Sequence, residues 1–136
     1  MLRVPAEAGQ LAGLNQYLLA FWQEAGLPDD ARFPFELALE EVFMNVVMHG
    51  SRPGQIPEFT ANLTHDGDDV VLAMSDTGIA FDPLEAPNPD INAAIEDRPI
   101  GGLGIYLLRE MMDSLAYTYE HERNHLTLRK RITADS

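Results

Sequence analysis

The sequence predicts an α+β fold, a two-layer α/β sandwich in which helices cover one face of a mostly antiparallel sheet. Three observations support this prediction. Apolar residues recur at helical spacing in some segments, and other segments alternate like strands and pair off as hairpins. The 136 residues are 46% hydrophobic, enough for one core, so we expect a single domain over residues 1–136.

The first part of the chain is expected to form one short strand and two helices. Residues 2–5 have the length of an edge strand that ends at proline. Residues 7–25 carry apolar side chains at helical spacing and are followed by Gly26, a typical stop signal. A second helix is expected from residues 28–30 to about residue 49, where Gly50 ends it.

The second part is expected to form two hairpins separated by a loop and a helix. Residues 58–76 indicate two strands. Residues 77–102 are rich in Pro, Gly and Asp, and a loop of this length in a compact domain is often functional. A helix is expected over residues 103–113, and residues 115–132 indicate a final hairpin that turns at Arg123-Asn124.

Composition and charge exclude several classes of function. The chain has no cysteine, which excludes disulfides and cysteine zinc sites and fits the cytoplasm, the expected location. The net charge of −13 repels phosphate backbones and anionic lipid, so we expect no direct nucleic-acid or membrane partner. We also expect no signal peptide and no membrane-spanning segment.

The segment ELALEEVFMNVVMHG, residues 36–50, combines an apolar helix with polar residues one turn apart. Glu41, Asn45 and His49 share one narrow sector of the helical wheel. A structural hydrogen bond between helix neighbours is the common explanation of such a pattern. The alternative is a cleft wall, in which Asn45 offers an oxygen to Mg²⁺ and Glu41 accepts a proton.

Two glycine-containing stretches suggest a ligand. In MSDTGIAFDP, Asp76 ends a strand, where a buried carboxylate can accept a hydrogen bond from an exocyclic amine, and Gly78 frees the turn. In RPIGGLGIYLLREMMDSLAY, three glycines open an amphipathic helix whose N-terminus suits phosphate. Taken alone, each stretch is more often an ordinary turn or helix start.

Other nucleotide-binding patterns are missing from the sequence. A P-loop needs a lysine after its last glycine, and Lys130 is the only lysine. The strand lysine and H-R-D loop of ordinary protein kinases are absent, and Leu107 stands where a dinucleotide motif needs its third glycine. A nucleotide site would therefore depend on metal, backbone amides and a helix dipole.

Together, the motifs resemble those of the GHKL ATPase superfamily, which has the Bergerat or histidine-kinase-like ATPase fold. The matching motifs are Glu41-x-x-x-Asn45 for the N box, Asp76-Thr-Gly78-Ile-Ala80 for the first glycine box and Gly101-Gly102-Leu103-Gly104 for the second. Their order, spacing and setting match over nearly the whole chain. The chain is most similar to the anti-sigma-factor serine/threonine kinases of bacterial partner-switching systems.

The resemblance implies a role for each matching residue. Asn45 would ligate the Mg²⁺ that bridges the ATP phosphates, and Glu41 would be the general base on a serine hydroxyl of the partner, or on water. Asp76 would bind the adenine amino group with Gly78 beside the ring. Further nucleotide contacts are implied at Ala80, Arg98 (a lid cation), Gly101, Gly102, Leu103, Gly104 and Thr127 (through water), with residues 82–100 as the ATP lid.

One position departs from the family pattern. The family usually has glycine where Ala80 stands, and a methyl group there is expected to restrict the lid hinge or crowd the nucleotide.

The resemblance implies an ATP-dependent serine/threonine kinase and anti-sigma regulatory factor. Its partners would be a STAS-type anti-anti-sigma protein, phosphorylated on serine, a sigma factor, and a second copy in a homodimer. The alternative is a nucleotide-binding regulatory module that binds a protein partner without phosphoryl transfer, and Glu41 favours the kinase. A histidine-kinase catalytic domain ranks lower, because 136 residues leave no room for a phospho-acceptor helix pair.

A zinc-protease signature also occurs, because residues 121–125 read H-E-x-x-H. That signature binds zinc only on a helix, which places both histidines on one face. The flanking residues alternate like strands, so we expect His121 and His125 to be exposed at a hairpin turn.

Overall fold

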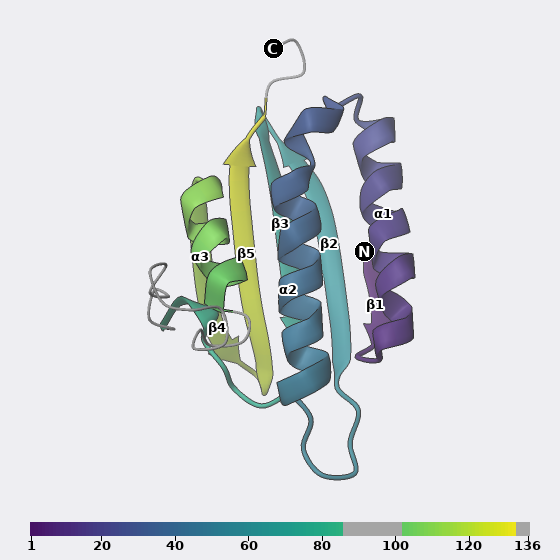
Figure 1. Cartoon of the computed structure of the whole chain (residues 1–136), viewed down its shortest axis with the longest axis vertical. Coiled ribbons are helices and arrows are strands. Elements are labelled where there is room, and N and C mark those ends of the chain that lie inside the picture. The colour runs from purple at the N-terminus through teal and green to yellow at the C-terminus, as the bar shows by residue number, and fades with distance from the viewer. Residues whose placement is uncertain (86–101, 133–136) are drawn as a thin grey trace.

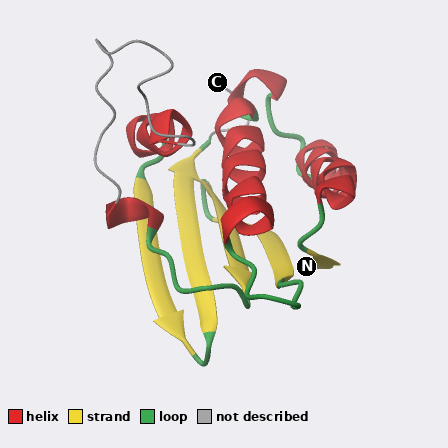
Figure 2. Cartoon of the chain, turned by 60° about the horizontal axis from the view of Figure 1, so that its bottom comes forward, coloured by secondary structure: helices red, strands yellow, loops and turns green. Residues whose placement is uncertain are grey.

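The structure is a computed structural model, which describes residues 1–85 and 102–132. One face of a five-stranded antiparallel sheet is covered by three α-helices, as Figures 1 and 2 show. This confirms the predicted α+β architecture. The strand order is β1-β2-β3-β5-β4. The strands are β1 (Leu2–Pro5), β2 (Glu58–Asp66), β3 (Asp69–Asp76), β4 (Ser114–Glu120) and β5 (Arg123–Arg131).

The helices lie side by side across the sheet, with α2 between α1 and α3 (Figure 1). They are α1 (Leu11–Glu24), α2 (Phe33–His49) and α3 (Gly102–Met111), with 3-10 turns η1 (Ala8–Gln10), η2 (Asp29–Ala31) and η3 (Pro83–Glu85). All three helices are confirmed, and their ends differ from the prediction by a few residues. None of the helices in the described part of the chain is long and apolar enough to cross a membrane.

The core between the helices and the sheet is built around four fully buried aromatic rings. Trp22 of α1 packs on Phe35 of α2 with ring centroids 5.4 Å apart, and Phe43 of α2 meets Phe59 of β2 edge to face at 5.1 Å. Burying such side chains contributes about 2–3 kcal/mol each before entropy is counted. Helix α2 is therefore anchored on both sides, which fixes the polar residues that it carries.

The final hairpin turns at His121 and Glu122, two residues earlier than predicted. Both residues have positive φ, 53° and 62°, as in the type I′ turn that commonly joins antiparallel strands. The sequence does not indicate this turn because neither residue is Gly, Asn or Asp. As predicted, the H-E-x-x-H segment therefore does not lie on a helix. His121 is exposed at the turn, but His125 lies on β5 and is half-buried, which corrects the expectation that both histidines are exposed at the turn.

Candidate functional site

Helix α2 forms one wall of the site through Glu41, which packs against the first turn of α3. A Cβ atom built on Gly104 would lie 2.3 Å from Cδ and 2.5 Å from Oε2 of Glu41, far inside contact distance. Because Gly104 has no Cβ, the α3 backbone comes this close to the carboxylate without displacing it. The N box and the second glycine box, which are far apart in sequence, therefore meet at this contact.

The Glu41 carboxylate is partly desolvated. Burial raises its pKa above the ordinary value, and the charge of Glu40 raises it further. In the described part of the chain no group donates a hydrogen bond to this carboxylate. A desolvated carboxylate without a donor is well suited to accept a proton.

Asn45 lies one turn after Glu41 on the same face of α2 and is half-buried. Within the described residues, its amide makes no hydrogen bond, neither to Glu41 nor to any other group. The structural hydrogen bond considered above is therefore not what Asn45 provides. Half-buried amides usually have a hydrogen-bond partner in the protein, and this one has none among the described residues. Its oxygen is therefore available to bind a hard cation such as Mg²⁺. His49, a further turn on, is exposed.

Asp76 is at the end of β3, and the residue is only 6% exposed. Its Oδ1 accepts two hydrogen bonds, from the Gly78 backbone N–H and from Asn124 Nδ2, both at 2.9 Å. The other oxygen, Oδ2, has no donor among the residues that the structure describes. It can therefore accept a hydrogen bond from a ligand.

The pKa of the Asp76 carboxyl is raised by burial, the dominant cause. The hydrogen bonds from Asn124 and Gly78 and the nearby Arg123 and His125 oppose this rise. The site thus holds an acceptor whose charge is poorly solvated, and a donor from a ligand would relieve that cost.

The first glycine box is fixed to α2 as well as to the sheet. Ile79 N donates to the Gly50 carbonyl at 2.9 Å, and a Cβ on Gly78 would lie 2.8 Å from the same oxygen. Thr77 is held by β2, because its backbone N–H donates to Glu58 O and its hydroxyl accepts from Glu58 N. Asp76 therefore lies near the C-terminal end of the helix that carries Asn45.

The sequence does not predict Asn124 as a site residue, because the expected hairpin turn includes Asn124. In the structure Asn124 is 7% exposed and links β5 to Asp76 and to the backbone at residues 78–81. A signal for this role exists in the sequence, because Asn124, Leu126 and Leu128 alternate along one strand face, and a buried asparagine needs partners.

Of the other predicted positions, two have described side chains that do not join Asp76 at the site. Thr127 alternates with the buried Leu126 and Leu128, so its side chain lies on the sheet face opposite Asp76, and we remove it from the site. Ala80 is exposed beyond the Asp76 turn. Positions outside the described residues are Arg98, Gly101 and residues 86–100 of the predicted lid, and only the helical backbone is described at Gly102 and Leu103.

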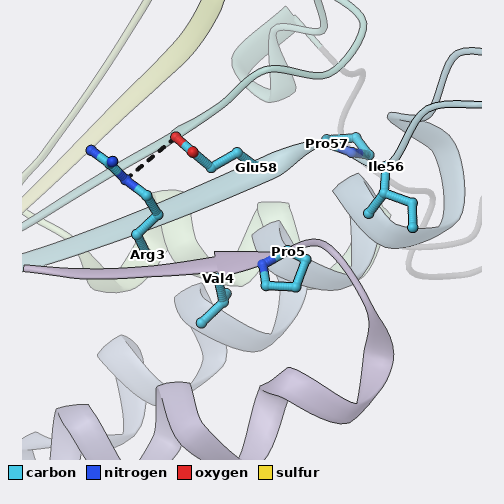
Figure 3. Close-up of a pocket in the computed structure, with 6 residues that line it drawn as sticks. All are labelled: Arg3, Val4, Pro5, Ile56, Pro57 and Glu58. Atoms are coloured by element: carbon cyan, nitrogen blue, oxygen red, sulfur yellow. Dashed lines mark ion pairs between the residues drawn. The ribbon is translucent and has the colours of Figure 1, made fainter.

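A shallow pocket lies elsewhere, at the edge strand β1 (Figure 3). It is lined by Arg3, Val4, Pro5, Ile56, Pro57 and Glu58, and Arg3 pairs with Glu58 at 3.5 Å. None of the predicted site residues lines it. Its lining offers no nucleophile or unpaired carboxylate, so it does not compete with the site on α2.

Residues 4–130 match the family described as the histidine kinase-like ATPase domain. The chain belongs to this family. It is 32% identical to the serine/threonine-protein kinase BtrW of Bordetella bronchiseptica over 77% of this chain and 74% of BtrW. It is 24% identical to the serine-protein kinase RsbW of Bacillus cereus and 26% identical to that of Listeria monocytogenes, in each case over 88% of this chain. The alignments span 76% and 78% of those proteins.

Family membership supports an ATP site on this chain. A histidine kinase-like ATPase domain binds ATP, and the residues on α2, β3 and α3 match the superfamily motifs in order. The resemblance to the anti-sigma-factor serine/threonine kinases is confirmed by the BtrW and RsbW relatives.

Proposed function

We propose that this GHKL protein is a serine/threonine kinase that transfers the γ-phosphoryl group of ATP to a serine of a protein partner and acts as an anti-sigma regulatory factor. The observation that carries the proposal is Glu41. Its desolvated carboxylate receives no hydrogen bond from the described residues and lies at the start of α3, on the same helix face as Asn45. A module that only bound nucleotide would not need a proton acceptor there.

Each group has one role in the proposed reaction. Asp76 Oδ2 accepts a hydrogen bond from the adenine amino group, and Asn45 holds Mg²⁺ through its amide oxygen. Bound Mg²⁺ neutralises phosphate charge. Glu41 accepts the proton of the attacking serine hydroxyl. The N–H groups at the start of α3 would bind the phosphates. Gly104 keeps the α3 backbone close to Glu41.

The partner class is proposed from the relatives and from the family resemblance. The RsbW relatives are named serine-protein kinases, and we propose that the substrate serine lies on a STAS-type anti-anti-sigma protein. We further propose a sigma factor as the second protein partner, a homodimer as the working form and the cytoplasm as the location. The net charge of −13 favours a partner with a basic docking surface.

The alternative is a nucleotide-binding module without phosphoryl transfer. Ala80 supports it, because its methyl group stands at the turn that leads into the predicted lid. Ala80→Gly tests whether that methyl group limits the nucleotide site. If the methyl group limits the lid, the glycine variant will bind ATP more tightly than the wild-type protein.

The first test is calorimetric titration of the protein with ATP, with and without Mg²⁺, beside Asn45→Ala. We expect Mg²⁺-dependent binding that weakens at least about tenfold in the variant, because one hard oxygen ligand is lost. His49→Ala, one turn further on at an exposed position, is the matched control and should bind normally. Absence of ATP binding by the wild-type protein would contradict the proposal.

The second test is transfer of labelled γ-phosphate to a STAS-domain protein. Wild-type protein should label it on serine, and Glu41→Gln should not, although it still binds ATP. Normal binding without transfer by the wild-type protein to any such partner would favour the binding module.

A further inference from the structure

We propose that Asn124 is a positioning residue that makes the site selective for purines with an amino group at position 6, because it fixes which oxygen of Asp76 faces the ligand. The inference rests on the proposed ATP site. It adds a residue that does not itself touch the nucleotide.

The orientation of the Asn124 amide is determined by its partners. Its Oδ1 accepts from the Phe81 backbone N–H at 3.0 Å and from the Tyr117 hydroxyl. A backbone N–H can only donate, so the oxygen must lie on that side. Nδ2 then donates to three acceptors, Asp76 Oδ1 at 2.9 Å, Ile79 O at 3.0 Å and Gly78 O at 3.4 Å.

The fixed amide in turn fixes the Asp76 carboxylate. Oδ1 receives Asn124 Nδ2 and the Gly78 N–H, and both are obligate donors. Asp76 and Asn124 are only 6% and 7% exposed, so water cannot easily replace these donors. Oδ2 is left to face the ligand. An ionised carboxylate oxygen only accepts, so it binds a 6-amino group and repels a 6-carbonyl group.

The same two donors would orient an asparagine at position 76. Its Oδ1 would take the place that accepts from Gly78 and Asn124, and its Nδ2 would face the ligand as a donor. Asp76→Asn should therefore prefer inosine triphosphate (ITP), which has a carbonyl at position 6, over ATP. The variant keeps the shape of the side chain and both inward hydrogen bonds, so we expect it to fold.

Asn124→Asp tests whether residue 124 sets this orientation. In the double variant Asp76→Asn/Asn124→Asp, residue 124 presents a carboxylate where the wild type presents N–H groups. The Gly78 backbone N–H still favours the amide oxygen on the inner side. The charge-assisted hydrogen bond from the amide nitrogen to the carboxylate at position 124 is about twice as strong as a neutral one, so it turns the nitrogen inward and the amide oxygen toward the ligand. The preference should return from ITP to ATP, although residue 124 contacts neither nucleotide.

The experiment measures Kd for Mg-ATP and Mg-ITP with each full-length variant, so every ratio comes from the same folded protein. We expect the wild type to favour ATP by about tenfold or more, Asp76→Asn to favour ITP, and the double variant to favour ATP again. Thr127→Val, on the opposite sheet face, is the control and should keep the wild-type ratio. Thermal unfolding monitors the folded state of each variant.

Three results would overturn the inference. If Asp76→Asn weakens both nucleotides equally, the orientation at position 76 does not set selectivity. If the double variant keeps the ratio of Asp76→Asn, or does not fold while Asp76→Asn fails to favour ITP, Asn124 is merely structural. If the wild-type protein binds neither nucleotide, the proposed function falls first and this inference with it.

Discussion

The backbone of Gly104 packs directly on the carboxylate of Glu41, so that no side chain fits between them. This contact joins two motifs that the sequence shows only as separate strings. It also gives Gly104 a role besides the proposed phosphate binding, because the residue leaves the space in which the proposed general base lies.

Gly104→Ala should displace the Glu41 carboxylate, the flexible end of its side chain, and should change stability by less than about 1 kcal/mol, because the higher helix propensity of alanine offsets part of the cost of this overlap. Removing Glu41 creates the missing space, so Gly104→Ala should cost less in a Glu41→Ala background. Urea unfolding of the four proteins in this double-mutant cycle measures the coupling.

Gly13→Ala in α1 is the control. A Cβ there meets nothing within 4 Å, so helix propensity should make the change neutral or stabilising by up to about 1 kcal/mol. Equal costs of Gly104→Ala in both backgrounds would contradict the contact.

As the pH is lowered, the rate of phosphoryl transfer should begin to fall at a higher pH than it would with an ordinary glutamate as the proton acceptor. Glu41 must be deprotonated to accept the serine proton, and its pKa is raised by burial and by Glu40. Glu40→Gln removes the second cause, so the acid limb of the pH–rate profile should move to lower pH. Glu41→Gln should lower the rate by about 10²-fold or more and abolish this limb. An acid limb that persists in Glu41→Gln would assign it to another group.

Asp76→Asn should stabilise the fold relative to the wild type, increasingly as pH rises. The pKa of Asp76 is raised in the folded protein, so the wild type binds its proton more tightly when folded. The stabilisation that this group contributes is fully present below its pKa in the unfolded chain. It is lost as the pH rises through its pKa in the folded protein. Asparagine keeps the Oδ1 acceptor and has no charge to bury. Free energies of unfolding measured from about pH 4 to about pH 7 give the difference, and a constant difference would contradict the shift.

Glu122→Gly should stabilise the final hairpin by about 1 kcal/mol, because Glu122 has φ of 62°, which side chains with a Cβ disfavour. Glu122→Ala keeps the Cβ and should give no such gain. Comparing the urea midpoints of Glu122→Gly and Glu122→Ala tests this prediction. Equal midpoints would mean that the turn relaxes without strain.

Local sequence patterns were sufficient for most of the secondary structure and for three parts of the site. Periodicity located α2 with Glu41 and Asn45 on one sector, and the strand before Asp76 was evident from its apolar alternation. These features depend on residues that are neighbours along one element. The predicted hairpin turn was two residues away from His121-Glu122, because the positive φ values there have no residue signal.

The sequence by itself determined the fold class, the family resemblance and the residue types that can carry the chemistry, because these depend on local spacing and on motif order. Only the tertiary structure decided which groups meet. Gly104 of α3 contacts Glu41 of α2, and Asn124 contacts Asp76 across 48 residues of chain. Strand parity then put Asn124 on the site face and Thr127 on the opposite face. Such contacts follow from the packing of helices on the sheet and from strand register, which act between residues that are distant in the sequence.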